Sequence, residues 1–273
     1  MRGLIRHNDY EVEYFVFGTG PETLIAFHGF NNNAWDFHDL GTICGNQYSV
    51  LAVNIFFHGS SRVQDRVISR GFSLKDLKDL FRDIYNILPT DKYTLMGYSL
   101  GGRICLKLFE LYPDKIDRII LLAPDGIRVS RFYLFLTRTF AGRFILKKVI
   151  YRPEIFFIVA RMLRKSGIVG EKKYQFAVNN FDNRHRREKV YQVWMTLRNV
   201  ISKNSSIKSL LGRYDVHLFL FFGKYDRIIP SSIGRRFARG AENHVHFYEL
   251  DEGHRMIRPD TLRKVMKIVN NQP

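Results

Sequence analysis

The chain has few cysteines, no long apolar run and no secretory leader pattern. Cys44 and Cys105 are the only cysteines among 273 residues and form no CxxC pair, so we expect two buried free thiols in a reducing compartment. The longest apolar run in the middle of the chain, Ile155–Ala160, is far shorter than the roughly 20 residues of a spanning helix. The segment Met1–Gly18 carries acids and lacks the apolar stretch of a signal peptide. These absences predict a soluble, cytoplasmic protein.

Acidic residues are scarce in one part of the chain only. Residues 128–213 contain 20 Lys or Arg and four acids, a net charge of +16, whereas the whole chain carries +17. The remainder is therefore almost neutral, at +1. Such a concentration of positive charge implies attraction to something acidic, and says nothing about the fold. Nucleic acid is disfavoured as the partner because no recognised nucleic-acid-binding motif is present.

Short apolar runs alternate with amphipathic segments outside that basic stretch. The predicted strands cover residues 10–17, 24–27, 49–57, 93–96, 119–122, 216–222 and 245–250. Helical spacing follows at residues 74–88, 103–111 and 262–269. This alternation predicts an α/β fold with a mostly parallel, doubly wound sheet. Residues 1–127 and 214–273 then form one core, and residues 128–213 are an inserted helical segment.

A nucleophile motif lies between a predicted strand and a predicted helix. Gly97-Tyr98-Ser99-Leu100-Gly101 fits G-x-S-x-G, in which the serine occupies a strained turn that only small neighbours allow. The turn would lift the Ser99 hydroxyl above the sheet at a helix N-terminus, where free N–H groups favour negative charge. The motif predicts Ser99 as a nucleophile.

A serine nucleophile needs a base, and the base needs a carboxylate to orient it. His254 lies in a loop after the last predicted strand, and Asp226 lies just past the strand 216–222. The order Ser, Asp, His is the one expected for a nucleophile elbow of this kind. Asp125, after the strand 119–122, is an alternative acid.

Most of the other histidines have structural interpretations, but His28 and His58 lie at strand ends before glycine and could line the pocket. The sequence predicts no metal ligand set. His217, His244 and His246 alternate with apolar residues and are interpreted as strand or strand-edge positions. No cofactor is expected.

Two backbone amides are expected to stabilise the oxyanion of a tetrahedral intermediate. One is the N–H of Leu100, directly after the nucleophile, and the other is the N–H of Phe30, in the loop after the strand 24–27. Neighbouring residues would border the substrate, and these are His28, Gly29, Tyr98 and Arg103.

These motifs together resemble the α/β-hydrolase superfamily. The residues that carry the resemblance are His28-Gly29-Phe30, Gly97 to Gly102, Gly223-x-x-Asp226 and Gly253-His254. The resemblance implies the α/β-hydrolase fold, with residues 128–213 in the place of a helical cap over the active site. The loop His58-Gly59-Ser60-Ser61 departs from the usual D-x-x-G-x-G-x-S, with Asn54 near the position of the acid. A serine nucleophile argues against the dehalogenases and epoxide hydrolases of the superfamily, which carry aspartate.

Three functions remain open from the sequence. The first is an esterase that hydrolyses an ester or thioester with an apolar acyl group. The second is a cofactor-free lyase or carbon–carbon bond hydrolase on an anionic substrate, because the motif through Arg103 is similar to that of the menaquinone-pathway synthase. The third is a non-enzymatic or peripheral membrane-binding role.

The basic segment also carries two apolar stripes. Phe132, Phe135, Leu136 and Phe140 form one stripe, and Ile155, Ile158, Val159 and Met162 form the other. They could pack on the core, leaving the bases as a solvated face. Alternatively, they suit the inner surface of an anionic membrane or an acidic acyl-carrier protein.

Overall fold

The computed structural model describes residues 1–167, 169–171, 174–175, 178 and 183–272, and divides the chain into two compact units. The first unit comprises residues 1–64, 73–128 and 200–273, and we call it the hydrolase unit after the resemblance noted in its motifs. The helical unit comprises residues 65–72 and 129–199. The helical unit therefore ends before the predicted boundary at residue 213, and it includes a short segment from earlier in the chain.

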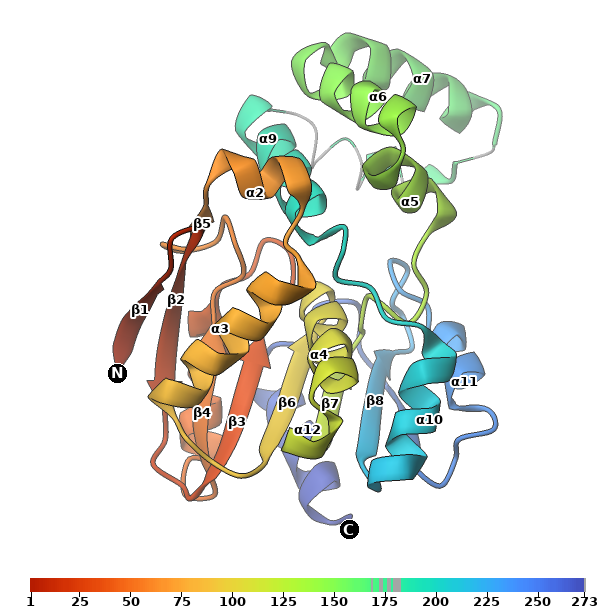
Figure 1. Ribbon diagram of the computed structural model, residues 1–273. Helices are drawn as coiled ribbons and strands as arrows, with labels where there is room; N and C mark the ends of the chain where they lie inside the picture. Colours follow the sequence, from red (N-terminus) through yellow and green to blue (C-terminus); the bar gives the residue numbers. More distant parts are fainter. Residues whose placement is uncertain (168, 172–173, 176–177, 179–182, 273) are drawn as a thin grey trace. The chain divides into compact units, whose positions relative to one another are not determined.

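The hydrolase unit is built on a nine-stranded sheet among the described residues, in the order β1-β2-β4-β3-β6-β7-β8-β9, with β5 beside β2 (Figure 1). The strands are β1 (Arg2–Arg6), β2 (Tyr10–Phe17), β3 (Glu22–Phe27), β4 (Tyr48–Val53), β5 (Arg62–Val63), β6 (Tyr93–Tyr98), β7 (Ile116–Leu122), β8 (His217–Gly223) and β9 (Val245–Leu250). The strands β4, β3, β6, β7, β8 and β9 lie side by side in that order, and each neighbouring pair is parallel. Strand β2 is antiparallel to its neighbours β1, β4 and β5. The predicted fold class is confirmed.

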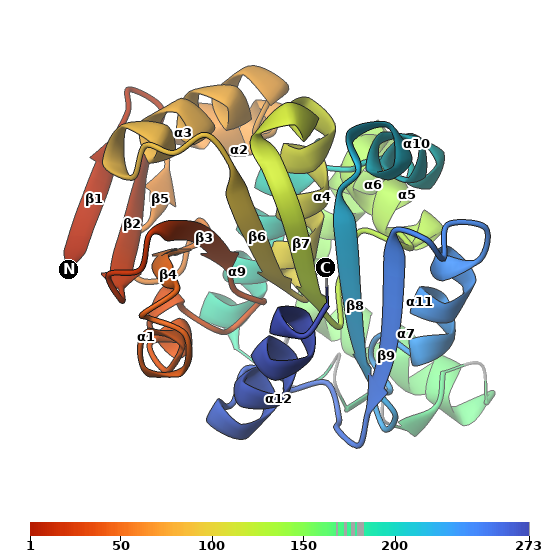
Figure 2. The same cartoon turned by 90° about the horizontal axis from the view of Figure 1, so that it is seen from below.

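Helices cover both faces of the sheet, as Figure 2 shows. Helices α3 (Leu74–Ile87), α4 (Leu100–Leu111) and α10 (Asn204–Tyr214) lie on one face, and α1 (Leu40–Ile43) and α12 (Pro259–Asn270) on the other. Helix α11 (Ser231–Ala238) packs on β8 and β9, and two short 3₁₀ helices are η1 (Ala34–Phe37) and η2 (Pro113–Lys115). Coverage on both faces explains why the central strands are continuous apolar runs.

Local sequence signals explain where the elements begin and end. Ser73 and Asp76 form a capping box at the start of α3, in which each side chain accepts the other's backbone N–H. The strand β4 ends at Val53, earlier than the predicted 49–57. There the side-chain Oδ1 of Asn54 accepts a hydrogen bond from Ala34 N–H at 2.7 Å. Phe57 has a positive φ of 67°, which is incompatible with a strand. The edge strand β1 was not predicted.

The helical unit contains α2 (Asp65–Arg70), α5 (Arg131–Arg138), α6 (Phe140–Tyr151), α7 (Pro153–Lys165) and α9 (Arg184–Leu197) among its described residues. Its apolar cluster is small and centres on Leu136, Leu146 and Met195. No described helix is both long and apolar enough to cross a membrane.

Most of the predicted apolar stripes of the helical unit do not pack into a core. Phe132, Phe140 and Met162 are 66%, 82% and 64% exposed, and Phe135 and Ile158 are also exposed. Leu136 is the buried exception. The side chains of Ile155 and Val159 lie outside the described part of the chain. The interpretation in which the stripes are buried is therefore wrong for these five exposed residues and right for Leu136.

Candidate active site

Ser99 occupies a strained turn between β6 and α4. Its backbone has φ 48° and ψ −113°, a region that side chains other than glycine rarely adopt. Its N–H donates to Leu122 O at 2.9 Å, which holds the turn at the carboxyl end of the sheet. A side chain at Gly97 would lie 2.7 Å from the backbone of Gly102. Small residues are therefore required on both sides of the serine.

The turn brings Ser99 to the two residues predicted from later in the sequence. His254 Nε2 lies 3.2 Å from Ser99 Oγ, and His254 Nδ1 lies 2.7 Å from Asp226 Oδ2. The Asp226 carboxylate is buried, and its Oδ1 accepts the backbone N–H groups of Ile228 and Ile229 at 2.8 and 2.9 Å. With Nδ1–H donating to Asp226, the lone pair of Nε2 is directed at the serine hydroxyl. Such a chain can accept the proton of the hydroxyl.

Asp125, the alternative acid, has a different partner. Its Oδ2 accepts a hydrogen bond from Arg103 Nη2 at 2.5 Å, and the Arg103 side chain is only 5% exposed. Asp125 therefore neutralises the Arg103 guanidinium, and Asp226 is the acid at His254. The Arg103 charge is therefore already paired within the protein, and its predicted contact with a substrate stays a prediction.

The loop after β3 lies directly against Ser99. A side chain at Gly29 would meet the Tyr98 ring at 2.8 Å and Ser99 Cβ at 3.1 Å, so only glycine fits there. Phe30 follows, as predicted for one oxyanion donor, and Leu100 begins α4, where first-turn N–H groups have no partner within the helix. Leu100 directly follows the serine, and Phe30 follows the glycine that contacts it; their role as oxyanion donors stays a prediction.

Two residues expected to border the substrate hold the backbone instead. His28 is fully buried; its Nδ1 donates to Gly29 O at 2.7 Å, and its Nε2 accepts Ile55 N–H at 3.0 Å. Tyr98 is 4% exposed and its hydroxyl donates to His254 O at 2.9 Å. Burial and the nearby Asp226 carboxylate raise the pKa of Tyr98 to about 12, so the hydroxyl remains a donor. The substrate-binding interpretation is therefore corrected for His28 and Tyr98.

His58, in the segment after β4, supports the loop that follows β3. Its Nε2 accepts Asn31 N–H at 3.2 Å, and its Nδ1 lies 3.0 Å from Phe56 O. Asn31 has a positive φ of 66°, a conformation that asparagine tolerates better than most residues. His58 thus fixes the turn next to Phe30 rather than lining a pocket.

Asn54 stands near the position where the usual motif has an acid, and a buried acid from elsewhere in the chain, which the sequence did not reveal, lies beside it. Glu13, on β2, accepts hydrogen bonds from Asn54 Nδ2 at 2.6 Å, from Ser60 N at 2.8 Å and from Arg2 Nε at 2.7 Å. Burial alone would raise the pKa of Glu13, but these donors hold it below its usual value. The carboxylate that the usual motif places in the loop comes here from the neighbouring strand. No local sequence signal could have identified it.

Comparison with known proteins gives a consistent result. The sequence model of a family described as alpha/beta hydrolase fold matches residues 22–257. An uncharacterized hydrolase, YugF, of Bacillus subtilis is 21% identical over 238 residues, covering 86% of this chain and 84% of its own. A 2-hydroxy-6-oxononadienedioate/2-hydroxy-6-oxononatrienedioate hydrolase of Pseudomonas putida is 21% identical, covering 86% and 82%. A thermophilic esterase of Thermogutta terrifontis superposes with a TM-score of 0.66 at 18% identity, over 99% of this chain and 98% of its own.

Proposed function

This chain belongs to the alpha/beta hydrolase fold family, and we propose that it is a serine hydrolase of carboxylic esters or thioesters. Ser99 is the nucleophile, His254 the general base and Asp226 the acid that orients it. The observation that carries the proposal is the continuous chain from Ser99 Oγ through the His254 ring to the buried Asp226 carboxylate, with distances of 3.2 and 2.7 Å. We further propose that the helical unit serves as a cap and favours an apolar acyl group.

In the first half of the reaction, Ser99 Oγ attacks the carbonyl carbon while His254 Nε2 takes its proton. The carbonyl π bond breaks and its electron pair moves to the oxygen. The N–H groups of Leu100 and Phe30 would stabilise that oxyanion. When the carbonyl reforms, the bond to the alcohol or thiol breaks, and His254 returns the proton to the leaving group. Ser99 then carries the acyl group as an ester.

In the second half, water takes the place of the serine hydroxyl. His254 removes a proton from the water as its oxygen attacks the acyl carbon, and then donates that proton to Ser99 Oγ as the acyl–serine bond breaks. The carboxylic acid leaves and the enzyme is regenerated. Asp226 keeps the imidazole in one tautomer and stabilises its charged form throughout.

The buried ion pair of Arg103 and Asp125 favours this chemistry over the lyase alternative. A lyase acting on an anionic substrate needs unpaired cations around the nucleophile, and Arg103 was the sequence candidate. Its Nη2 donates to Asp125 and its side chain is buried. This supports an ester or thioester as the substrate class.

A fluorophosphonate probe tests the proposal directly. We expect covalent labelling of the wild-type protein and none of Ser99→Ala, because the probe reacts only with an activated serine. Ser205→Ala, an exposed position on α10, is the matched control and should label as the wild type does. A wild-type protein that stays unlabelled, while Ser99→Ala folds normally, would overturn the proposal. A panel of esters of increasing chain length then measures the acyl preference.

We propose a second role, attachment to an anionic membrane surface, for the helical unit. On α6, Phe140 and Phe144 are 82% and 57% exposed, one turn apart, and Lys147 and Lys148 follow on the same helix. The Lys148 ammonium lies 5.4 Å from the centre of the Phe144 ring. Exposed aromatic residues next to bases are suited to insertion at a negatively charged lipid surface.

Vesicle co-sedimentation distinguishes this role from catalysis. The protein should bind vesicles containing anionic lipid at low salt and dissociate as the salt concentration rises. Ser99→Ala should bind equally well, because the nucleophile takes no part in attachment. Equal binding to neutral and anionic vesicles, or none to either, would remove the role. Selective binding to an acidic acyl-carrier protein in place of vesicles would identify that partner instead.

A further inference from the structure

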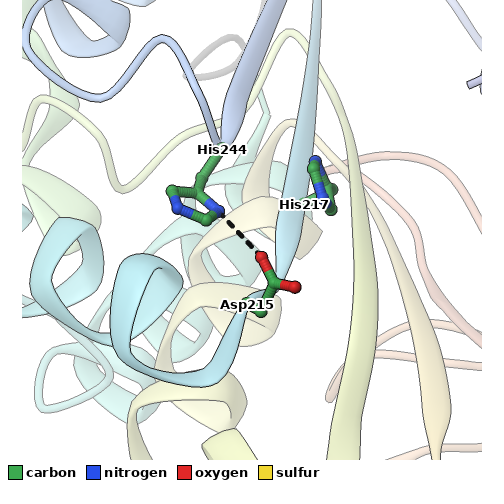
Figure 3. Close-up of side chains that lie close together, drawn as sticks. All are labelled: Asp215, His217 and His244. Atoms are coloured by element: carbon green, nitrogen blue, oxygen red, sulfur yellow. Dashed lines mark ion pairs between the residues drawn. The ribbon is translucent and has the colours of Figure 1, made fainter. Parts of the chain in front are cut away.

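A second cluster of chemically active side chains lies in the hydrolase unit, at the amino ends of β8 and β9. Asp215 directly follows α10 as its C-cap, His217 is the first residue of β8, and His244 directly precedes β9. Their oxygen and nitrogen ligand atoms all lie within 4.8 Å of one another. Figure 3 shows the three side chains, with a dashed line for the ion pair of Asp215 and His244. Asp226 and His254 follow the opposite ends of the same two strands. Since β8 spans seven residues, about 20 Å of strand separates the two clusters.

From this cluster we propose a binding site for a divalent transition-metal ion, with Zn²⁺ the best fit, held by Asp215, His217 and His244. Two imidazoles and one carboxylate are a ligand set typical of zinc, whereas Ca²⁺ and Mg²⁺ prefer oxygen ligands alone. Three protein ligands leave a fourth position for water. The inference does not depend on the proposed hydrolase activity.

The spacing of Asp215 and His244 already suits one ion. Asp215 Oδ1 lies 3.6 Å from His244 Nδ1, too far for a hydrogen bond. Tetrahedral zinc with bonds of about 2.0–2.1 Å sets its ligands about 3.3 Å apart. His244 Nδ1 is buried, and within the described part of the chain no hydrogen-bond partner reaches it. A bound ion would satisfy this nitrogen.

The third ligand, His217, is oriented by a neighbouring imidazole. His217 Nδ1 lies 2.8 Å from His246 Nε2, and the two rings stack at 5.1 Å. With Nδ1 occupied by His246, Nε2 is the nitrogen of His217 that can face an ion. Metal-binding histidines commonly use their second nitrogen in this way. His246 is therefore a positioning residue, not a ligand.

Backbone hydrogen bonds hold the three ligand-bearing segments in place without metal. His244 O accepts the Leu218 N–H at 2.8 Å, and Val216 N donates to Leu211 O at 3.0 Å. Asp215 has a left-handed backbone with φ 53°, and its side chain is 87% exposed. The carboxylate can therefore rotate to close the site, while the two imidazoles move little.

Nearby charge sets a limit on the affinity. Arg118 on β7 is the register partner of His217, and a cation there opposes a second one. The single carboxylate of Asp215 offsets part of the repulsion. The bound ion would join α10, β8 and β9 as a clamp.

Zinc titration of the full chain tests the site. After treatment with EDTA, ZnCl₂ is titrated by calorimetry, and thermal unfolding is followed with and without Zn²⁺. We expect one tight site per chain and a rise in the unfolding midpoint of about 5 °C, because the ion binds the folded state alone. With Co²⁺ as the probe, visible absorption bands of low-coordinate cobalt should appear.

Matched variants assign the ligands. Asp215→Asn keeps a residue that tolerates the left-handed backbone, and His244→Gln keeps a polar side chain. Each should remove the zinc-induced rise in midpoint and the cobalt bands, and His246→Gln should weaken binding about tenfold. His38→Gln is the control, because His38 also lies beside a carboxylate, at 3.3 Å from Asp39, but not in a three-ligand cluster of the described residues.

The outcomes separate this site from the candidate active site. Fluorophosphonate labelling of Ser99 should be unchanged when one equivalent of zinc is bound. Loss of labelling together with unchanged binding to Asp215→Asn would locate the ion at His254 and overturn the proposal. Absence of binding at about a hundredfold excess of zinc would overturn it also. Comparing the zinc-induced shift, rather than the absolute midpoint, corrects for any instability of a variant.

Discussion

The hydrolase unit and the helical unit use the same residue types in opposite ways. In the hydrolase unit phenylalanines such as Phe219 and Phe221 are fully buried in the sheet, whereas in the helical unit Phe132 and Phe140 are mostly exposed. The charge follows the same division, since the helical unit (residues 65–72 and 129–199) holds 18 Lys or Arg and five acids, a net charge of +13, and the hydrolase unit carries the remaining +4. Buried apolar area stabilises a fold, but an exposed apolar patch next to bases indicates a surface for binding. The two units therefore differ in what their apolar residues do.

The largest expected effect tests the choice of acid in the hydrolase unit. Asp226→Asn should lower kcat on an ester substrate by about 10⁴-fold, because the amide no longer holds His254 in the correct tautomer. Asp125→Asn is the matched control, since Asp125 pairs with Arg103 and not with His254. It should retain most activity at temperatures where it stays folded. Equal losses in the two variants would contradict the assignment.

Truncating one phenylalanine in each unit tests the contrast in burial. Phe221→Ala should reduce the free energy of unfolding by about 3–5 kcal/mol, because it leaves a cavity in the centre of the sheet. Phe140→Ala should change it by less than about 0.5 kcal/mol, since that ring is already exposed. Urea denaturation measures both. Comparable destabilisation by Phe140→Ala would mean that its ring is covered in solution.

Two glutamates with lowered pKa values extend the comparison to electrostatics. Glu13 in the hydrolase unit is buried in a hydrogen-bond network, whereas Glu171 in the helical unit is exposed beside Arg164 and Gln175. Glu13→Gln should reduce the free energy of unfolding by about 2 kcal/mol at neutral pH, because charged hydrogen bonds are lost. Glu171→Gln should leave the unfolding midpoint unchanged.

The pH dependence has a definite sign for Glu13. Its pKa is lower in the folded than in the unfolded chain, so its contribution is complete above the unfolded value and is lost as the pH falls through the folded one. The difference between wild type and Glu13→Gln should therefore shrink below about pH 4.5. A difference that is constant from neutral pH to pH 3 would show that the carboxylate is not the cause.

The smallest expected effect concerns the basic face of α6. Lys147→Gln should weaken binding to anionic vesicles by about 1 kcal/mol, roughly fivefold, since each base near the lipid contributes about that much. Lys224→Gln in the hydrolase unit, which removes an equal charge beside Asp251, should leave vesicle binding unchanged. Co-sedimentation at constant ionic strength compares them. Equal weakening by both would indicate attraction through net charge alone.

Local patterns predicted most of the hydrolase unit. The strand preceding Ser99 and the helix after it follow from apolar periodicity and glycine spacing, and the structure has them as β6 and α4. His254 and Asp226 were predicted as partners of Ser99 by their order in the chain, and the structure brings them within hydrogen-bond distance. Local patterns predict these features because a strand buried on both faces requires consecutive apolar residues, and a tight turn requires small residues beside it.

Tertiary structure alone decided which distant side chains meet. The amino-acid sequence determined the α/β alternation, the strained serine turn and the uneven distribution of charge, all of which depend on residues close together in the chain. It did not show that Glu13 supplies the acid beside Asn54, that Arg103 is paired with Asp125, or that Asp215, His217 and His244 converge. Those contacts depend on strand order and register, which bring together residues from separate segments, and no short-range pattern encodes that proximity.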